Sequence, residues 1–174
     1  MNIISGAYKN FKLEAPKNSV THPMGSREKL ALFNMLTGHF DNATILDGYA
    51  GTGALGLEAL SRGAKKAVFI EKDPKAIEVI KLNAKKIQTE KEIQILKKDL
   101  KTYTPDELFD IVFLDPPYDH YDELEFITVP NYLKTGGILV LSHPKTAPAP
   151  TLDSLKLQST HTYAMASISL YIKQ

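Results

Sequence analysis

The sequence predicts an α/β domain in which a central, mostly parallel β-sheet carries helices on both faces. Strand-like and helix-like segments alternate from residue 44 to residue 142, which favours right-handed βαβ units. The segments AVFIE (67–71) and DIVFLD (110–115) are nearly continuous apolar runs, as expected for strands that are buried on both faces. A glycine-rich turn follows the first strand of the series, where open α/β sheets bind ligands.

The first forty residues are expected to form an extension of this core. The segments IISG (3–6) and FKLEAP (11–16), separated by AYKN, have the pattern of a short hairpin. A helix is expected at about 27–37, with Ser26 as its N-terminal cap and Gly38 as its stop, because apolar residues recur there at helical spacing.

The alternating series begins with the strand TILD (44–47), the helix ALGLEALSR (54–62) and the strand AVFIE. Pro74 opens a helix that runs to about residue 87, with isoleucines and an alanine along one face. The strands EIQIL (92–96) and DIVFLD follow.

The last third is expected to contain a weaker helix over 121–133, disturbed by Pro130, and then the strand ILVLS (138–142). Alternating segments at 156–163 and 167–172 suggest an antiparallel edge of the sheet. No repeat or linker is visible. One domain is therefore expected over 1–174, with 1–40 as the hairpin-and-helix extension and 41–174 as the core.

The composition excludes several kinds of chemistry. The chain has no cysteine, so it can form no disulfide, thiolate zinc site or cysteine nucleophile. Its histidines lack short ligand spacing, and no metal site is expected. Neither a membrane-spanning run nor a signal-peptide core is visible, so a cytoplasmic protein is expected. The net charge of +1 does not decide for or against a nucleic-acid partner.

The segment LDGYAGTGALG (46–56) carries the first binding motif. Gly51, Gly53 and Gly56 have the spacing of a dinucleotide-binding loop, in which glycines let the backbone approach a ligand closely. Such a loop can hold a pyrophosphate or the amino-acid portion of S-adenosylmethionine. Asp47 favours the second ligand, because its carboxylate would repel a diphosphate and attract an ammonium group.

Acidic residues also follow the second and third strands. Glu71 can accept hydrogen bonds from both ribose hydroxyls of an adenosine, a group that NAD and S-adenosylmethionine share. Asp73 is expected to cap the helix that begins at Pro74. Asp99, beside Leu100, can accept a hydrogen bond from the adenine amine, or it can be an ordinary loop residue. The sequence leaves both possibilities open.

The tetrapeptide Asp115-Pro116-Pro117-Tyr118 directly follows the fourth strand. An exocyclic base amine is a poor nucleophile, because its lone pair is delocalised into the ring. The Asp115 carboxylate and the Pro116 carbonyl can each accept one N–H, which aims the lone pair at a sulfonium methyl group. Tyr118 offers a surface on which an extruded base can stack, and the prolines fix the backbone. The alternative is that the two prolines simply end a buried strand.

With these motifs the chain resembles the Rossmann-like class I methyltransferases, and within them the bacterial 16S ribosomal RNA guanine-N2 methyltransferase family. The resemblance runs nearly end to end and is most specific from Ala50 to Arg62. It also covers Ile3–Gly6, Pro23, Arg27, Leu32–Asn34, Phe69–Glu71 and Asp115–Tyr118.

The resemblance implies seven strands in the order 3-2-1-4-5-7-6, with strand 7 antiparallel, and S-adenosylmethionine as the cofactor. It implies cofactor contacts from Asp47, Gly48, Tyr49, Ala50, Gly51, Thr52, Gly53, Glu71, Lys72, Asp99 and Leu100. The residues from Asp115 to Tyr118 would bind the guanine amine. The partner would be ribosomal RNA or the small-subunit particle, contacted by Lys9, Lys12, His22, Arg27 and Lys29. A monomer is implied.

Three positions depart from the family pattern. His22-Pro23-Met24 stands where the family usually has Arg-Pro-Thr. The family also has an Arg-Glu pair near the position at which this chain has Lys29-Leu30. Tyr163-Ala164 replaces a commoner Tyr-Gly. The first two departures concern substrate contacts more than catalysis, since the cofactor and amine motifs are intact.

Three other functions fit parts of the sequence. An adenine-N6 methyltransferase acting on DNA or RNA could use the same tetrapeptide, but 174 residues leave no room for a separate DNA-recognition domain. A nonenzymatic binding factor on a methyltransferase scaffold would not need Asp47, Glu71 and Asp115. An NAD-dependent oxidoreductase does not explain the segment from Asp115 to Tyr118.

Overall fold

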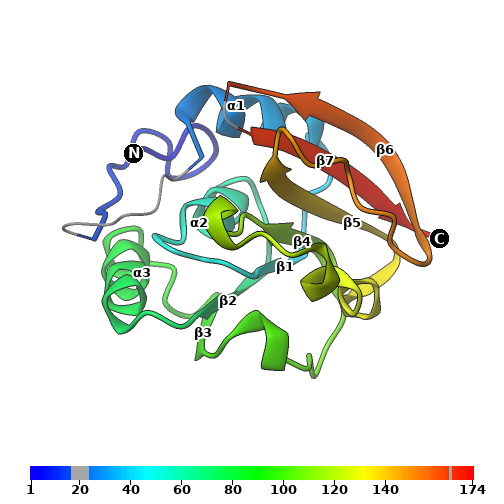
Figure 1. The fold of residues 1–174 in the computed structure, drawn as a ribbon. Coiled ribbons are helices and arrows are strands. Elements are labelled where there is room, and N and C mark those ends of the chain that lie inside the picture. The colour runs from blue at the N-terminus through cyan, green and yellow to red at the C-terminus, as the bar shows by residue number, and fades with distance from the viewer. Residues whose placement is uncertain (17–23, 165) are drawn as a thin grey trace.

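The computed structural model describes residues 1–16, 24–164 and 166–174, which fold around one seven-stranded sheet (Figure 1). Its order, β3-β2-β1-β4-β5-β7-β6, confirms the predicted order. The strands from β1 to β5 pair in parallel, and β7 runs antiparallel to both β5 and β6. The strands are β1 (Thr44–Asp47), β2 (Lys66–Glu71), β3 (Ile93–Lys97), β4 (Phe109–Leu114), β5 (Leu133–Pro144), β6 (Leu155–Thr162) and β7 (Ala166–Lys173).

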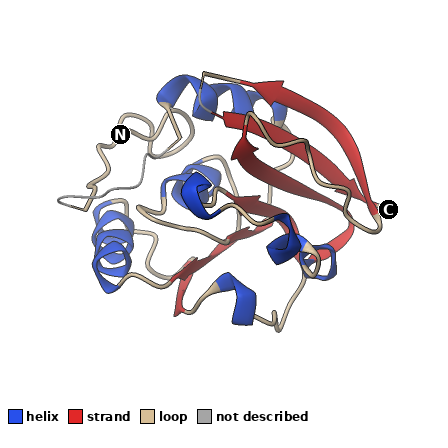
Figure 2. Ribbon diagram, in the orientation of Figure 1, coloured by secondary structure: helices blue, strands red, loops and turns tan. Residues whose placement is uncertain are grey.

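Helices cover the sheet (Figure 2), and the two faces carry different kinds of helix. The α-helices α1 (Ser26–Met35), α2 (Ala54–Ser61) and α3 (Pro74–Lys86) share one apolar cluster with Ile45 and Phe113. Side chains alternate along a strand, so their neighbours Leu46 and Val112 belong to the opposite cluster. That cluster is covered by the short 3₁₀ helices η1 (Leu100–Thr102), η3 (Glu123–Phe126) and η4 (Val129–Tyr132).

The helix predicted over 121–133 is wrong. The segment instead forms η3 and η4, with another 3₁₀ turn, η2, at Tyr118–His120. Pro130 lies within η4, and a proline lacks the N–H that an α-helix needs at this point. Asp122 also starts a separate turn, because its carboxylate accepts a hydrogen bond from the Leu124 amide at 3.0 Å.

The predicted helix caps were right in one case and wrong in another. Asp73 caps α3 as predicted, accepting a hydrogen bond from the Lys75 amide at 2.9 Å. Ser26 does not cap α1. It is the first helical residue, and Gly25 occupies the cap position without any side-chain hydrogen bond.

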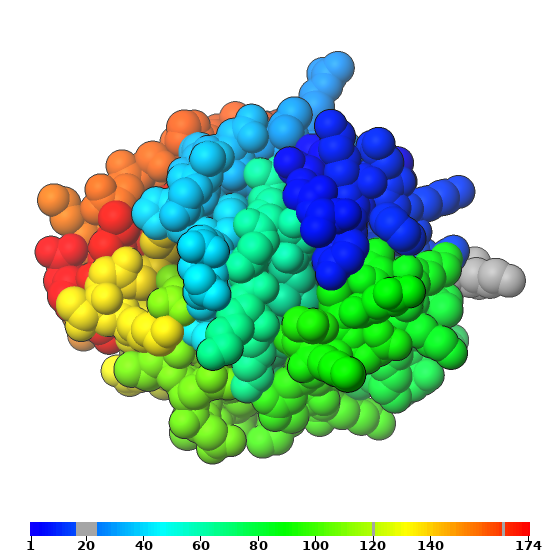
Figure 3. Space-filling model, turned by 180° about the vertical axis from the view of Figure 1, so that it is seen from behind, coloured from blue at the N-terminus to red at the C-terminus, as the bar shows by residue number. Residues whose placement is uncertain are grey.

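The N-terminal extension packs against α2 and α3. Its predicted hairpin is present in a short form: Asn2 and Lys12 form an antiparallel bridge, and the amides of Ile3 and Leu13 donate to the carbonyls of Phe11 at 3.0 Å and Met1 at 2.9 Å. Figure 3 shows these residues, in dark blue, against the green surface that includes α3. The Glu14 amide donates a hydrogen bond to the Asn83 side chain at 2.8 Å, and the Asn83 amide group donates back to the Glu14 carbonyl at 3.1 Å.

A buried carboxylate on α2 holds the first residues of the extension and α1 together. Glu58 is fully buried in α2 and accepts hydrogen bonds from the amides of Ile4 at 2.7 Å and Ser5 at 3.0 Å. It also forms ion pairs with Lys29 Nζ at 3.2 Å and Arg62 Nε at 2.9 Å. The extension therefore depends on a charge network that lies beneath it.

The outer edge of the sheet is irregular. β6 pairs only with β7, and most of its residues are exposed. Its register shifts between Leu157 and Ser159, so Gln158 has no partner on β7. This places a β-bulge in the edge strand.

Candidate functional site

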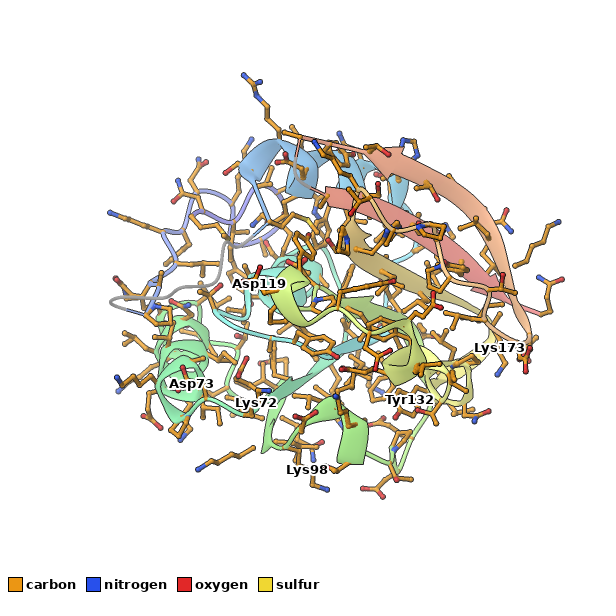
Figure 4. The ribbon with its side chains drawn as sticks, in the orientation of Figure 1. Lys72, Asp73, Lys98, Asp119, Tyr132 and Lys173 are labelled. Atoms are coloured by element: carbon orange, nitrogen blue, oxygen red, sulfur yellow. The ribbon has the colours of Figure 1, made fainter. Side chains whose placement is uncertain are left out.

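The predicted cofactor and catalytic residues lie at the carboxyl end of the parallel strands. Asp47 ends β1, Glu71 ends β2, Asp99 follows β3 and Asp115 follows β4. Figure 4 shows Lys72, Asp73 and Asp119 toward this end, whereas Tyr132 and Lys173 lie toward the opposite end. Neighbouring parallel strands thus bring together residues that are distant in the sequence.

The glycine-rich loop has the conformation that its glycines predict. Gly51 and Gly53 have φ values of +53° and +75°, in the left-handed region that side chains other than glycine rarely adopt. At Gly56 a Cβ atom would lie 2.4 Å from the Phe69 ring, so this glycine lets α2 lie close against β2. The first two glycines therefore shape the loop, and the third serves packing.

Asp47 is buried and only half satisfied. Its side chain is 1% exposed, and Oδ2 accepts a hydrogen bond from the Gly56 amide at 3.1 Å. Within the described residues Oδ1 has no partner. Burial, together with the negative charges of Asp115 and Glu71, raises the pKa of Asp47 to about 7, although the hydrogen bond from Gly56 opposes the shift. An unpaired buried carboxylate oxygen fits a ligand that carries a cationic hydrogen-bond donor.

Glu71 holds the glycine-rich loop to the end of β2. Its Oε2 accepts a hydrogen bond from the Gly51 amide at 2.8 Å. Its Oε1 accepts hydrogen bonds from the amides of Lys72 and Asp73, each at 2.8 Å. A carboxylate has about four acceptor positions, so one remains for a ribose hydroxyl.

Asp99 has two local partners. Its carboxylate accepts a hydrogen bond from the Lys101 amide at 3.1 Å, and it forms an ion pair with Lys72 Nζ at 3.5 Å. Leu100 beside it is buried. These contacts suit a loop aspartate that starts a 3₁₀ turn.

A second polar network, which the sequence did not predict, fixes Tyr49. Its hydroxyl donates to Glu125 Oε2 at 2.8 Å, and Lys101 Nζ lies 2.7 Å from Glu125 Oε1. Burial and the Glu125 charge both raise the pKa of Tyr49, so the phenol stays protonated and donates. Glu125 comes from a segment predicted to be an α-helix, and no motif pointed to it.

The tetrapeptide after β4 forms a compact polar cluster with Ser142. The Tyr118 hydroxyl lies 3.3 Å from Asp115 Oδ1 and also hydrogen-bonds the hydroxyl of Ser142. Burial raises the pKa of Asp115, while hydrogen bonds from Ser142, Tyr118 and the Met24 backbone oppose this shift. No motif in the sequence pointed to Ser142, which lies on β5, the strand next to β4.

The predicted substrate contacts divide into three groups. Lys9, Lys12 and Arg27 are exposed, as an RNA contact requires. His22 lies outside the described residues. The prediction for Lys29 is wrong, because this side chain is 1% exposed and its ammonium group is bound to Glu58. Its charge neutralises an internal carboxylate and does not face solvent.

Two features are absent from the described residues. No group of three or more histidine, aspartate or glutamate side chains there is placed to hold a metal ion. No helix in the described ranges combines the length and the apolar character needed to cross a membrane.

Residues 1–172 match the family described as Conserved hypothetical protein 95. The Bacillus subtilis protein YlbH is 32% identical over 183 residues, which cover 100% of both chains. A Haemophilus influenzae protein named Ribosomal RNA small subunit methyltransferase D is 32% identical over 98% of this chain and 93% of its own. The structure of Escherichia coli yhhF has a TM-score of 0.89 and 26% identity, covering 100% of this chain and 98% of that one.

Proposed function

The chain belongs to the family described as Conserved hypothetical protein 95, and from this membership we propose that it methylates ribosomal RNA. Its fold is the Rossmann-like class I methyltransferase fold. The Haemophilus influenzae relative is named as a methyltransferase of small-subunit ribosomal RNA. We propose the same substrate here, with S-adenosylmethionine as the methyl donor and the N2 amine of a guanine as the acceptor.

The unpaired oxygen of Asp47 is the observation that best supports this cofactor. When bound, S-adenosylmethionine supplies a methyl group on a positively charged sulfur. Asp115 and Glu71 lie close enough to Asp47 for their charges to act on it, so the site is negative wherever these carboxyl groups are ionised. Negative potential favours a cationic cofactor and opposes a diphosphate such as NAD. We propose that Asp47 receives the ammonium group and Glu71 a ribose hydroxyl.

We propose that Asp115 prepares the amine for transfer. Its carboxylate accepts one N–H and the Pro116 carbonyl accepts the other, which turns the nitrogen lone pair toward the methyl group. The raised pKa of Asp115 makes it a better acceptor for the proton that the amine releases after methylation. Pro117 fixes the backbone beside Tyr118, whose ring supports the extruded base.

The choice of guanine N2 over adenine N6 follows from the sequence resemblance. The alternative is methylation of adenine N6 by the same four residues. To decide, the protein is incubated with labelled S-adenosylmethionine and small-subunit particles, and the RNA is digested to nucleosides for mass analysis. The proposal expects N2-methylguanosine. Recovery of N6-methyladenosine would favour the alternative, and binding of the cofactor without transfer would favour the nonenzymatic factor.

We propose that Lys9, Lys12 and Arg27 contact the phosphate backbone of this RNA. The combined substitution of the three residues by alanine should weaken RNA binding and make its dependence on salt shallower. Lys81 and Lys85 on α3 provide the control, because they are also exposed but lie outside the proposed contact surface. Equal effects from both sets would refute this surface.

We also propose that the chain acts as a cytoplasmic monomer. A monomer would elute at the size of one 19.3 kDa chain in gel filtration with light scattering. A larger particle that persists on dilution would contradict it.

A further inference from the structure

We propose that Ser142 is a positioning residue for methyl transfer. Its hydroxyl, on β5, bonds the Tyr118 hydroxyl, which itself lies 3.3 Å from Asp115 Oδ1, and so keeps both groups in the arrangement that receives the amine. This inference rests on the function proposed above for Asp115 and Tyr118. It adds a residue from a different strand to that site.

The register of the sheet brings Ser142 beside Asp115. Leu114, the last residue of β4, pairs with Leu141 on β5, so Asp115, which directly follows β4, lies beside Ser142, the next residue of β5. On its other side Ser142 pairs with Ile168 of β7. A residue held between two strands has little freedom to move, and a group anchored in this way can fix the orientation of its neighbours.

The burial of Ser142 requires its hydroxyl to find a partner within the protein. The residue is 1% exposed, and a buried hydroxyl without a hydrogen bond is destabilising. One arrangement of protons satisfies all three groups. Either hydroxyl of the Ser142–Tyr118 pair can be the donor. An ionised carboxylate can only accept, so in the proposed arrangement Ser142 accepts the proton of Tyr118 and donates its own proton to Asp115.

This arrangement matters when the amine binds. The Tyr118 hydroxyl now lies 3.3 Å from Asp115 Oδ1, an oxygen that the amine must reach. Because Tyr118 also bonds Ser142, it can release Asp115 and still keep a partner. Without the serine hydroxyl, the phenol would have Asp115 as its remaining partner in this cluster and would compete with the substrate.

The direction of the effect on pH dependence follows from the contacts around Asp115. The charged and titratable groups that face it are Asp47 on β1 and Tyr118, and Glu28 of α1 acts on Tyr118 in turn. A hydrogen bond from Ser142 favours the ionised form of Asp115. Removing that hydroxyl should raise the pKa of Asp115. When the pH is lowered, Asp115 then gains a proton earlier, so methyl transfer should be lost at a higher pH than in the unchanged protein.

The test compares Ser142→Ala with Ser142→Thr, which keeps the hydroxyl, and with Ser169→Ala. Ser169 is a matched control, since it is fully buried in β7 and hydrogen-bonds His143 and Thr160, away from Asp115. Methyl transfer to small-subunit particles is measured from pH 5 to 9. We expect Ser142→Ala to lower kcat by roughly 10- to 100-fold, the effect of one hydrogen bond to a charged group. The acidic limb of its curve of kcat against pH should move to higher pH.

Two further measurements make the result unambiguous. The affinity for S-adenosylhomocysteine, measured by calorimetry, should stay within about twofold of the original, because the cofactor contacts are untouched. The carboxyl carbon of Asp115, titrated by ¹³C NMR and assigned with Asp115→Asn, should show a higher pKa in Ser142→Ala alone. Ser142→Thr should restore both kcat and the original pKa of Asp115.

The outcomes separate the inference from the proposed function. If the unchanged protein transfers no methyl group, the proposed function fails, and the NMR titration still tests the role of Ser142. An unchanged Asp115 titration in Ser142→Ala would overturn the inference. An equal shift in Ser169→Ala would also overturn it, because the effect would then be a general loss of packing.

Discussion

Replacing Glu58 by Gln should destabilise the protein far more than the loss of an ordinary surface charge. The substitution keeps the size of the side chain and removes its negative charge. Glu58 and Lys29 are both buried, so water cannot take the place of the carboxylate beside the Lys29 ammonium group. The amides of Ile4 and Ser5 would also share one acceptor oxygen in place of two.

The expected loss can be estimated from these contacts. Removing one partner of a buried ion pair costs about 3–5 kcal/mol. Lys29 keeps one hydrogen bond, from Nζ to the Asn2 carbonyl at 2.9 Å, which places the loss near the lower limit. A loss of about 3 kcal/mol is a large part of the total stability of a typical domain, about 5–15 kcal/mol.

The assay is urea unfolding at neutral pH, followed by circular dichroism. Glu78→Gln is the control, because its ion pair with Lys81 is exposed and should contribute less than about 0.5 kcal/mol. Adding Lys29→Met to Glu58→Gln should recover part of the stability, since no unpaired buried charge remains. A loss below about 1 kcal/mol for Glu58→Gln would refute the reasoning.

The pH dependence of the same variant provides a second check. Burial lowers the pKa of Lys29, and Glu58 opposes this shift. Without Glu58 the folded-state pKa of Lys29 should fall further below its unfolded value. The charged form is then the destabilising one, so the loss should be largest at low pH and shrink as the pH rises through the folded pKa.

The other predictions concern the site. Gly53→Val should abolish cofactor binding in calorimetry, because φ is +75° and a Cβ atom would lie 3.3 Å from Ile80. Gly38→Val is the control: its φ is +89° but the space around it is open, so this variant should lose stability and keep cofactor binding. Asp115→Ala should reduce methyl transfer at least about 100-fold with little loss of fold, and near-normal turnover would exclude its proposed role. Cofactor affinity should weaken as the pH falls through about 7, where Asp47 gains a proton, and Asp47→Asn should remove this dependence.

The strands and the carboxyl-end motifs were predictable because each is determined locally. The runs around Phe69 and Phe113 are apolar without alternation, and such runs occur where a strand is buried on both faces. Asp73 could be identified as a cap from the proline that follows it. The tetrapeptide from Asp115 to Tyr118 is contiguous, so its position after a strand was enough to place it at the ligand edge.

The errors and omissions concern partners that are distant in the sequence. Lys29 looks like a surface residue until Glu58, 29 positions later, is found beneath it. Ser142 and Glu125 belong to the site through the register of β5 and the path of η3, and neither lies in a motif. Pairings of this kind depend on the tertiary packing of the chain, which a pattern along the sequence does not specify.

The bulge at Gln158 bears on how this protein avoids associating with itself. An exposed edge strand offers unpaired N–H and C=O groups to any other strand, and this is a common start of aggregation. β6 also carries Leu157, which is 44% exposed and would favour such contact. The register shift interrupts the even spacing of these groups, so a second strand cannot extend the sheet over its full length. The irregularity of the outermost strand thus protects the protein from forming continuous intermolecular sheets at high concentration.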